Sequence, residues 1–207
     1  GKFPDYAGGA VGDDLYVDFP REWESQVRER FEPVAIAGGF TNKIEFTYDI
    51  THLVFLGNRP YPTAVQDEDG IWRHRLRWGK QLGRCLYKLG WQRMPSVDCL
   101  AWMKGVAWAA LISNPHVPIL RAYAISVLEQ TDGVHMRVPQ ELWKWRMPAE
   151  RRPVTVTPYT FDMLQSVYGL SKTQVALSEH ALLCATLGEI INNEWLMQIF
   201  EVDKASM

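Results

Sequence analysis

Apolar and polar positions alternate over residues 15–19, which is the period of a β-strand with one buried face. Small residues occupy positions 7–11, and Gly12 supplies the backbone freedom that a tight bend needs. This pattern predicts a β-hairpin with Asp13 and Asp14 at its tip.

A helical period follows the hairpin. Pro20 suits the first position of a helix, and Trp23, Val27 and Phe31 then recur four residues apart. The pattern predicts an amphipathic helix that is ended by Pro33 and the pair Gly38-Gly39.

Short extended segments are predicted after this helix. The alternation over 43–48 and over 52–56 is typical of strands, and Gly57-Asn58 predicts a turn. A third extended segment, 60–65, is expected to pair beyond that turn.

The period becomes helical again from Trp72. Residues 73–93 contain seven Arg or Lys and no acidic residue. On a helical projection one side carries Arg73, Arg77, Lys80, Arg84 and Lys88. The opposite side carries Trp78, Leu82, Cys85, Leu86 and Leu89. This predicts a basic amphipathic helix that binds nucleic-acid phosphates, lies on an anionic membrane, or simply exposes its cations to solvent.

The rest of the chain is predicted to be helical, with breaks at Pro, Gly and Asn clusters. Helices are expected from Pro95, from 118 to about Glu129, from Thr157 to Gly169, and from a Ser171–Gln174 capping box to about Phe200. A loop is expected over 146–158, and residues 201–207 are expected to fray.

Composition adds little to this picture. Hydrophobic residues make up 47% of the 207 positions and charged residues 22%, which is ordinary for a globular protein. The net charge of −2 means that any nucleic-acid binding depends on a local basic patch. The cysteines and histidines show no metal-ligand spacing. No apolar run approaches the roughly 20 residues that span a bilayer, so we expect a soluble chain.

The predicted hairpin tip carries the most specific chemistry. Two adjacent carboxylates repel each other unless a hard divalent cation with further oxygen ligands lies between them, and Mg²⁺ is the natural candidate. The alternative is that Gly-Asp-Asp is an ordinary solvated turn, since Gly and Asp are common turn residues.

Several segments in order resemble the later palm motifs of positive-strand viral RNA-dependent RNA polymerases. Val-Gly-Asp-Asp resembles motif C, Gly39–Lys43 resembles motif D, and Phe55–Arg59 resembles motif E. The resemblance covers residues 7–62, and nodavirus-like polymerases are the subgroup that it suggests. It implies an α+β fold, in which a small antiparallel palm sheet with a packed helix (residues 1–70) precedes a mostly α-helical thumb (residues 71–207).

The resemblance implies template-directed nucleotidyl transfer by two-metal catalysis. Asp13 would be the main ligand of Mg²⁺ (or Mn²⁺) from this hairpin, and Asp14 a weaker or outer ligand. Lys43 would protonate the leaving pyrophosphate or neutralise its charge. A solvated lysine at the start of a strand is the alternative for Lys43.

The motif E resemblance implies contacts with the RNA primer. Phe55, Leu56 and Gly57 would support the primer strand, and Arg59 would touch its backbone. Plain core packing is the alternative for Phe55 and Leu56.

Two parts of the polymerase pattern are missing. A second metal-binding aspartate, in a D-x-x-x-x-D strand, and a ribose-selecting Ser-Gly helix do not occur in suitable places; Asp13 and Asp18 have the spacing but share one strand. We therefore expect a chain that is inactive alone, whose partners are RNA template and product, nucleoside triphosphates, and the remaining palm and fingers on another chain or an upstream segment.

The expected location is the host cytoplasm, at membrane-bound replication sites, or inside a virion. Two other hypotheses remain open at this point. The chain is a non-catalytic RNA-binding or scaffold subunit of a viral replication complex, or it is an unrelated helical interaction protein in which Gly-Asp-Asp is only a turn.

Overall fold

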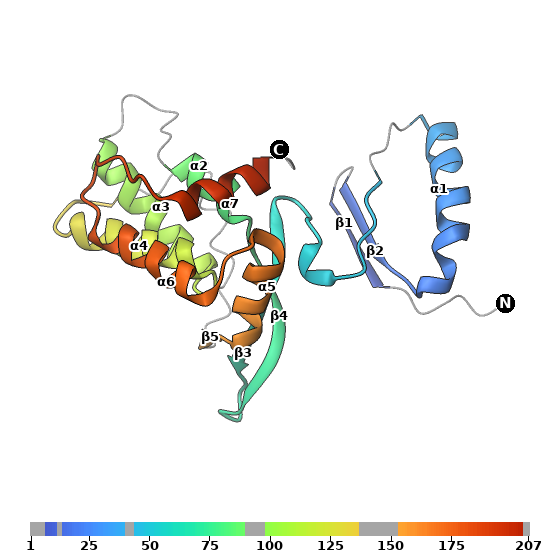
Figure 1. Cartoon of the computed structure of the whole chain (residues 1–207), viewed down its shortest axis with the longest axis horizontal. Helices are drawn as coiled ribbons and strands as arrows, with labels where there is room; N and C mark the ends of the chain where they lie inside the picture. The colour runs from blue at the N-terminus through green and yellow to red at the C-terminus, as the bar shows by residue number, and fades with distance from the viewer. Residues whose placement is uncertain (1–6, 12–13, 40–43, 90–97, 137–152, 205–207) are drawn as a thin grey trace. The chain divides into compact units, whose positions relative to one another are not determined.

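The computed structural model describes residues 7–11, 14–39, 44–89, 98–136 and 153–204 (Figure 1). The chain has the predicted α+β fold and divides into two compact units, Gly1–Ile50 and Thr51–Met207. The boundary between the two units follows Ile50. It therefore lies earlier in the chain than the predicted boundary between residues 70 and 71. That position lies in the turn between two paired strands of the second unit.

The first unit contains the predicted hairpin. Strands β1 (Ala7–Val11) and β2 (Asp14–Asp18) pair antiparallel. A short 3₁₀ helix, η1 (Arg21–Trp23), leads into α1 (Glu24–Ala37). The predicted end at Gly38-Gly39 is confirmed, because α1 ends at Ala37 and Gly38 is its C-cap, with an N–H that donates to the Val34 carbonyl (3.0 Å). The prediction that Pro33 also ends the helix is wrong, because Pro33 lies inside α1.

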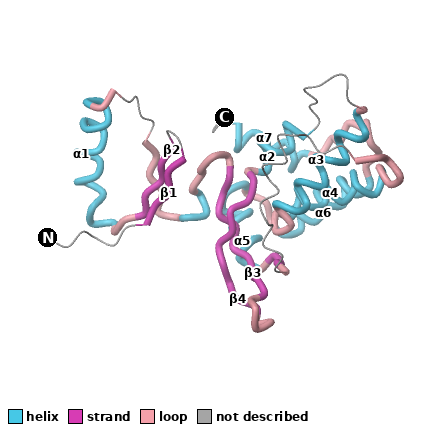
Figure 2. The backbone as a smooth tube through the Cα atoms, turned by 180° about the vertical axis from the view of Figure 1, so that it is seen from behind, coloured by secondary structure: helices cyan, strands magenta, loops and turns pink. Residues whose placement is uncertain are grey.

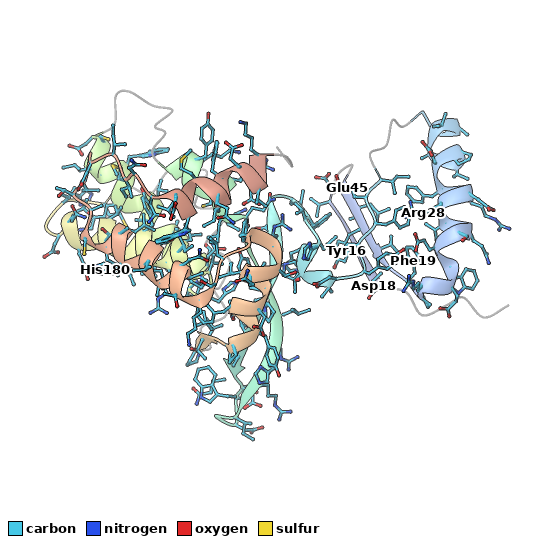
Figure 3. All side chains as sticks on the ribbon, viewed as in Figure 1. Tyr16, Asp18, Phe19, Arg28, Glu45 and His180 are labelled. Carbon is cyan, nitrogen blue, oxygen red and sulfur yellow. The ribbon has the colours of Figure 1, made fainter. Side chains whose placement is uncertain are left out.

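Side-chain contacts hold residues 44–48 against α1. The predicted strand over 43–48 is absent from the described residues 44–48, so this part of the prediction is wrong. The Phe46 ring lies edge-on to Phe19 with centroids 6.4 Å apart, and the Arg28 guanidinium lies 3.6 Å from its centroid. The Tyr48 hydroxyl donates to Glu24 (2.6 Å). Figure 3 labels Phe19 and Arg28 in this arrangement.

The second unit is built on a three-stranded antiparallel sheet. It contains β3 (Asn58–Gln66), β4 (Trp72–Lys80) and β5 (Val154–Val156), in the order β4-β3-β5. The predicted strand over 52–56 is wrong, because η2 (Ile50–His52) occupies its start and only Phe55 forms an isolated bridge. Strand β5 was predicted as loop.

Strand β4 contradicts the predicted helix over residues 73–93. The letters Trp-Arg-His-Arg-Leu-Arg-Trp satisfy a two-residue period as well as a helical one. All nine residues of β4 pair with β3, from Asn58↔Lys80 to Gln66↔Trp72. A helix begins only at Leu82, so the basic segment is part strand and part helix.

Helices complete the second unit. They are α2 (Leu82–Leu89), α3 (Cys99–Ser113), α4 (Pro118–Gln130), α5 (Pro158–Tyr168), α6 (Lys172–Cys184) and α7 (Glu194–Lys204). Helix α3 begins after the cap Asp98, whose side chain accepts from the Ala101 N–H (2.9 Å), and Pro95 lies outside the described residues. The predicted capping box at Ser171 and Gln174 is confirmed.

The hydrophobic core of this unit centres on α4, which packs between α3 and α6. Its buried apolar residues are Ile119, Leu120, Ala122, Ala124 and Val127. Figure 2 shows α5 beside the β3–β4 hairpin, whose tip extends beyond that helix.

A buried carboxylate joins four elements of the second unit. Asp203 of α7 is fully buried and accepts hydrogen bonds from the Gly83 N–H (2.8 Å), the Tyr168 hydroxyl (3.0 Å) and the Gln81 amide (3.3 Å). The Arg59 guanidinium lies 3.5 Å from it. A buried carboxylate is tolerated when it is paired and hydrogen-bonded in this way. The prediction that residues 201–204 fray is therefore wrong, because α7 continues through Lys204.

We expect Asp203→Ala to lower the free energy of unfolding by about 3–5 kcal/mol, because the buried Arg59 charge would lose its counterion. Chemical denaturation monitored by circular dichroism measures this. The matched control is Glu201→Ala, since Glu201 forms an exposed pair with Lys204 (3.6 Å) and such pairs contribute less than about 1 kcal/mol. Equal effects of the two substitutions would contradict the role of Asp203.

Another buried polar residue, His116, lies in the loop between α3 and α4. Its ring lies edge-on to Tyr61, with centroids 5.8 Å apart, and it packs closely against Gly79. Burial, and then the positive charge of Arg77, lowers the pKa of His116 to about 4. The imidazole is therefore neutral in the folded protein near neutral pH.

This pKa predicts a specific acid sensitivity. Between pH 6.5 and about 4 the unfolded chain binds a proton at His116 and the folded chain does not, so stability falls as the pH is lowered through this window. At pH 4 the free energy of unfolding is lower by about 3 kcal/mol than it is above pH 6.5. Denaturation midpoints of wild type and His116→Gln should diverge in their pH dependence, whereas His135→Gln, an exposed control, should follow wild type. A slope that His116→Gln leaves unchanged would refute the assignment.

Candidate functional site

Of the two predicted metal ligands, the structure describes Asp14, which lies in the hairpin of the first unit. Asp14 is the first residue of β2, is paired with Val11, and its side chain is exposed. Asp13 lies outside the described residues, as does Lys43, the predicted proton donor. The predicted hairpin is therefore confirmed by the pairing of β1 and β2, while the metal-binding role of the acidic pair remains a prediction.

The described residues do not complete a metal site by themselves. Within them, no group of three His, Cys, Asp or Glu side chains is arranged to hold an ion. Mg²⁺ prefers several oxygen ligands and is rarely held by one carboxylate. A magnesium centre at Asp14 would therefore need Asp13 and carboxylates from another segment or chain.

Residues 55–58 form a tight turn. The Phe55 and Asn58 backbones exchange two hydrogen bonds (3.0 and 2.9 Å), and the central residues Leu56 and Gly57 have φ angles of 52° and 68°. Positive φ at both central positions is the pattern of a type I′ turn, which favours Asn-Gly. Leucine is an unusual first residue here, and its side chain is 44% exposed.

Part of the predicted basic stripe lies beside this turn. The Arg84 guanidinium packs against Gly57, where an added Cβ would be 3.3 Å from Nη1. Burial lowers the pKa of Lys80, and the neighbouring charges of Arg84 and Lys88 lower it further. These three cations are therefore near one another, from the end of β4 at Lys80 to the last turn of α2 at Lys88, and Arg84 brings the group against the turn at residues 55–58.

Arg73 and Arg77, which were also predicted to contact RNA, lie earlier on β4, the strand that ends at Lys80. Arg73 forms an ion pair with Asp67 (2.5 Å), and Arg77 is half-buried near His116. The prediction that Arg73 and Arg77 share a helical face with Lys80 is wrong, because both lie on a strand. Phe55 is half-buried, with its ring centroid 6.1 Å from that of Trp78.

Arg59 has an internal role. It is 6% exposed, and besides contacting Asp203 it donates from Nη1 to the His52 carbonyl (3.0 Å). Burial raises the pKa of Tyr168, so that hydroxyl remains a donor to Asp203. Sequence reasoning missed Asp203 and Tyr168, because nothing in the local pattern distinguishes them from other helical residues.

A thiol and an imidazole also lie together on α6. Cys184 Sγ is 3.6 Å from His180 Nε2, and both residues are exposed. Burial raises the pKa of a different thiol, Cys85, to about 11, which makes it a poor nucleophile. Neither arrangement includes the third group that a nucleophilic or metal site requires.

Comparison with models of known protein families, with curated proteins and with solved structures found no match. Among the described residues, no helix has the length and apolar character needed to cross a bilayer. Function must therefore be argued from the residues of this chain.

The turn at residues 55–58 yields a stability prediction. Leu56→Asn should raise the free energy of unfolding by about 1 kcal/mol, because asparagine tolerates positive φ better than leucine. Gly57→Ala should lower it by at least about 1 kcal/mol, because a Cβ is strained at this φ and approaches Arg84. Urea denaturation of both variants tests the pair. Destabilisation by Leu56→Asn would show that leucine is held there by contacts rather than tolerated despite strain.

Proposed function

We propose that this chain is the palm-and-thumb part of an RNA-dependent RNA polymerase, active only when a partner chain or an upstream segment supplies the fingers and the rest of the palm. The observation that carries the proposal is the antiparallel pairing of β1 and β2, with Gly-Asp-Asp at their connection. The helix that follows and the turn at residues 55–58 occur in the order of the polymerase motifs.

The surface of the first unit supports a need for additional protein. None of its described residues is buried, and apolar side chains of both the hairpin and α1 are exposed. They include Val11, Leu15, Val17, Val34 and Ile36. An isolated two-stranded hairpin is marginally stable in water and gains stability from further strands or packing. The missing palm strands would supply that cover.

The proposed reaction is nucleotidyl transfer directed by an RNA template. Asp13 and Asp14, with carboxylates from the partner, would hold Mg²⁺ (or Mn²⁺), which supplies charge stabilisation at the transferring phosphate. Lys43 would hold a proton at Nζ for the leaving pyrophosphate. The basic cluster at Lys80, Arg84 and Lys88 would bind the phosphates of template or product.

The proposed setting is a viral replication complex in the host cytoplasm, at membrane-bound sites or within a virion. A non-catalytic RNA-binding subunit of such a complex is the second candidate. The observation that favours it is that the two features belong to different units: the basic cluster belongs to the second unit, which has a hydrophobic core, whereas Asp14 is exposed on a unit none of whose described residues is buried.

Substitution at the hairpin separates the two candidates. In the complex purified with its partner proteins, Asp13→Ala should reduce RNA synthesis by at least about 100-fold, which is the scale of losing a group that stabilises transition-state charge. Incorporation of labelled nucleotide on an RNA template measures this.

Asp18→Ala is the matched control, since it removes an exposed carboxylate from the same hairpin and should leave synthesis near the wild-type rate. Wild-type synthesis by Asp13→Ala would reject the catalytic role and leave the RNA-binding subunit as the better account.

A further inference from the structure

Strand β4 exposes large apolar side chains on one face. Alternate residues of a strand point to the same side, and the even-numbered residues Trp72, Leu76 and Trp78 are 48%, 48% and 42% exposed. Tyr159 of α5 extends this face, since its ring lies 5.6 Å from that of His74 and is 59% exposed. We refer to these five residues as the β4 aromatic face.

The odd-numbered positions of the same strand carry cations. Arg73 and Arg75 are exposed and Arg77 is half-buried. No acidic residue occurs from Ile71 to Val97, and the ion pair of Arg73 with Asp67 offsets the positive charge of this segment at one end only. The local charge is opposite in sign to the net charge of −2.

The position of β4 in the sheet makes both its apolar side chains and its arginines accessible. In the order β4-β3-β5, β4 is an edge strand of the described sheet, so side chains of both faces can reach a ligand that lies along that edge. The tip of the β3–β4 hairpin also extends beyond α5, the helix that packs beside this hairpin (Figures 1 and 2).

We propose that the β4 edge binds single-stranded nucleic acid, with bases stacked on Trp72 and Trp78 and phosphates bound by Arg75 and Arg73. Alternation of aromatic rings with cations matches a polymer in which flat bases alternate with phosphates. Bases of an intact duplex are already stacked on one another, so their faces are not available to these rings. This binding requires neither Asp13 nor a partner chain, and it is therefore independent of the polymerase proposal.

Charge argues for nucleic acid over an added protein strand. Edge strands that carry several cations disfavour pairing with another strand of the same kind, which is how many proteins prevent edge-to-edge association. Three arginines on nine residues of β4 are of this type. An anionic polymer with aromatic bases can stack on the aromatic side chains of one face and pair with the arginines of the other. An ordinary peptide strand would form only backbone hydrogen bonds along the edge.

The test is fluorescence anisotropy of a labelled oligouridine RNA, about 12 nucleotides long, titrated with the full 207-residue chain. Trp72→Ala should weaken binding about 5- to 100-fold, the scale measured for loss of one stacked base. Trp78→Ala should act similarly, with thermal unfolding recorded because Trp78 contacts Phe55. Tyr87→Ala, at an exposed aromatic residue of α2, is the control and should bind as wild type.

Arginine substitution gives an independent measurement. Arg75→Ala should reduce the slope of log affinity against log salt by about 0.7, the value expected for one lost contact to a single strand. Arg121→Ala removes the same charge from the exposed surface of α4 and should leave the slope unchanged. Arg75→Lys should retain most of the wild-type slope.

Four outcomes would overturn the proposal. They are no binding in low salt, tighter binding of a duplex of the same length, equal affinities of Trp72→Ala and wild type, and a change of oligomeric state caused by Trp72→Ala without RNA. The last result would assign the β4 edge to protein association. Loss of oligouridine binding in Trp72→Ala, with unchanged binding by Asp13→Ala, would support the β4 site whatever the outcome for catalysis.

Discussion

The second unit depends on one buried interaction, the contact of the Asp203 carboxylate with Arg59 and its hydrogen-bond donors. A buried charge without partners is costly, so each donor must be held in place for the fold to be stable. These donors come from β3, the start of α2 and the end of α5, while the carboxylate comes from α7. The network therefore sets the relative positions of four elements that are far apart in the sequence.

This network also positions the surfaces that carry the functional proposals. Arg59 lies at the start of β3, directly after the turn at residues 55–58, and Gly83 lies in the first turn of α2. Because both contact one carboxylate, the turn is held beside Arg84 and the basic cluster. The strand β4, paired along its whole length with β3, is held in register by the same anchor.

The two units differ in the way they are stabilised. The second has a hydrophobic core and a buried polar network around Asp203, and these hold the elements that carry its surface residues. The first has exposed apolar side chains on both its hairpin and its helix, and its described contacts, such as Arg28 over Phe46, lie near the surface. The catalytic proposal concerns the unit for which a partner is proposed, whereas nucleic-acid binding at β4 concerns the unit that has its own hydrophobic core.

The sequence by itself determined those features that depend on neighbouring residues. Examples are the hairpin around Gly-Asp-Asp, the capping box at Ser171, the break before Pro118 and the α+β class. Only the tertiary structure decided the state of residues 72–80, because their pattern satisfies both a strand and a helix, and pairing with β3 selects the strand. Tertiary structure also brought Arg59 into contact with Asp203, which lies 144 residues later in the sequence. The sequence could not predict this contact, because a contact between distant residues leaves no local periodicity in the chain.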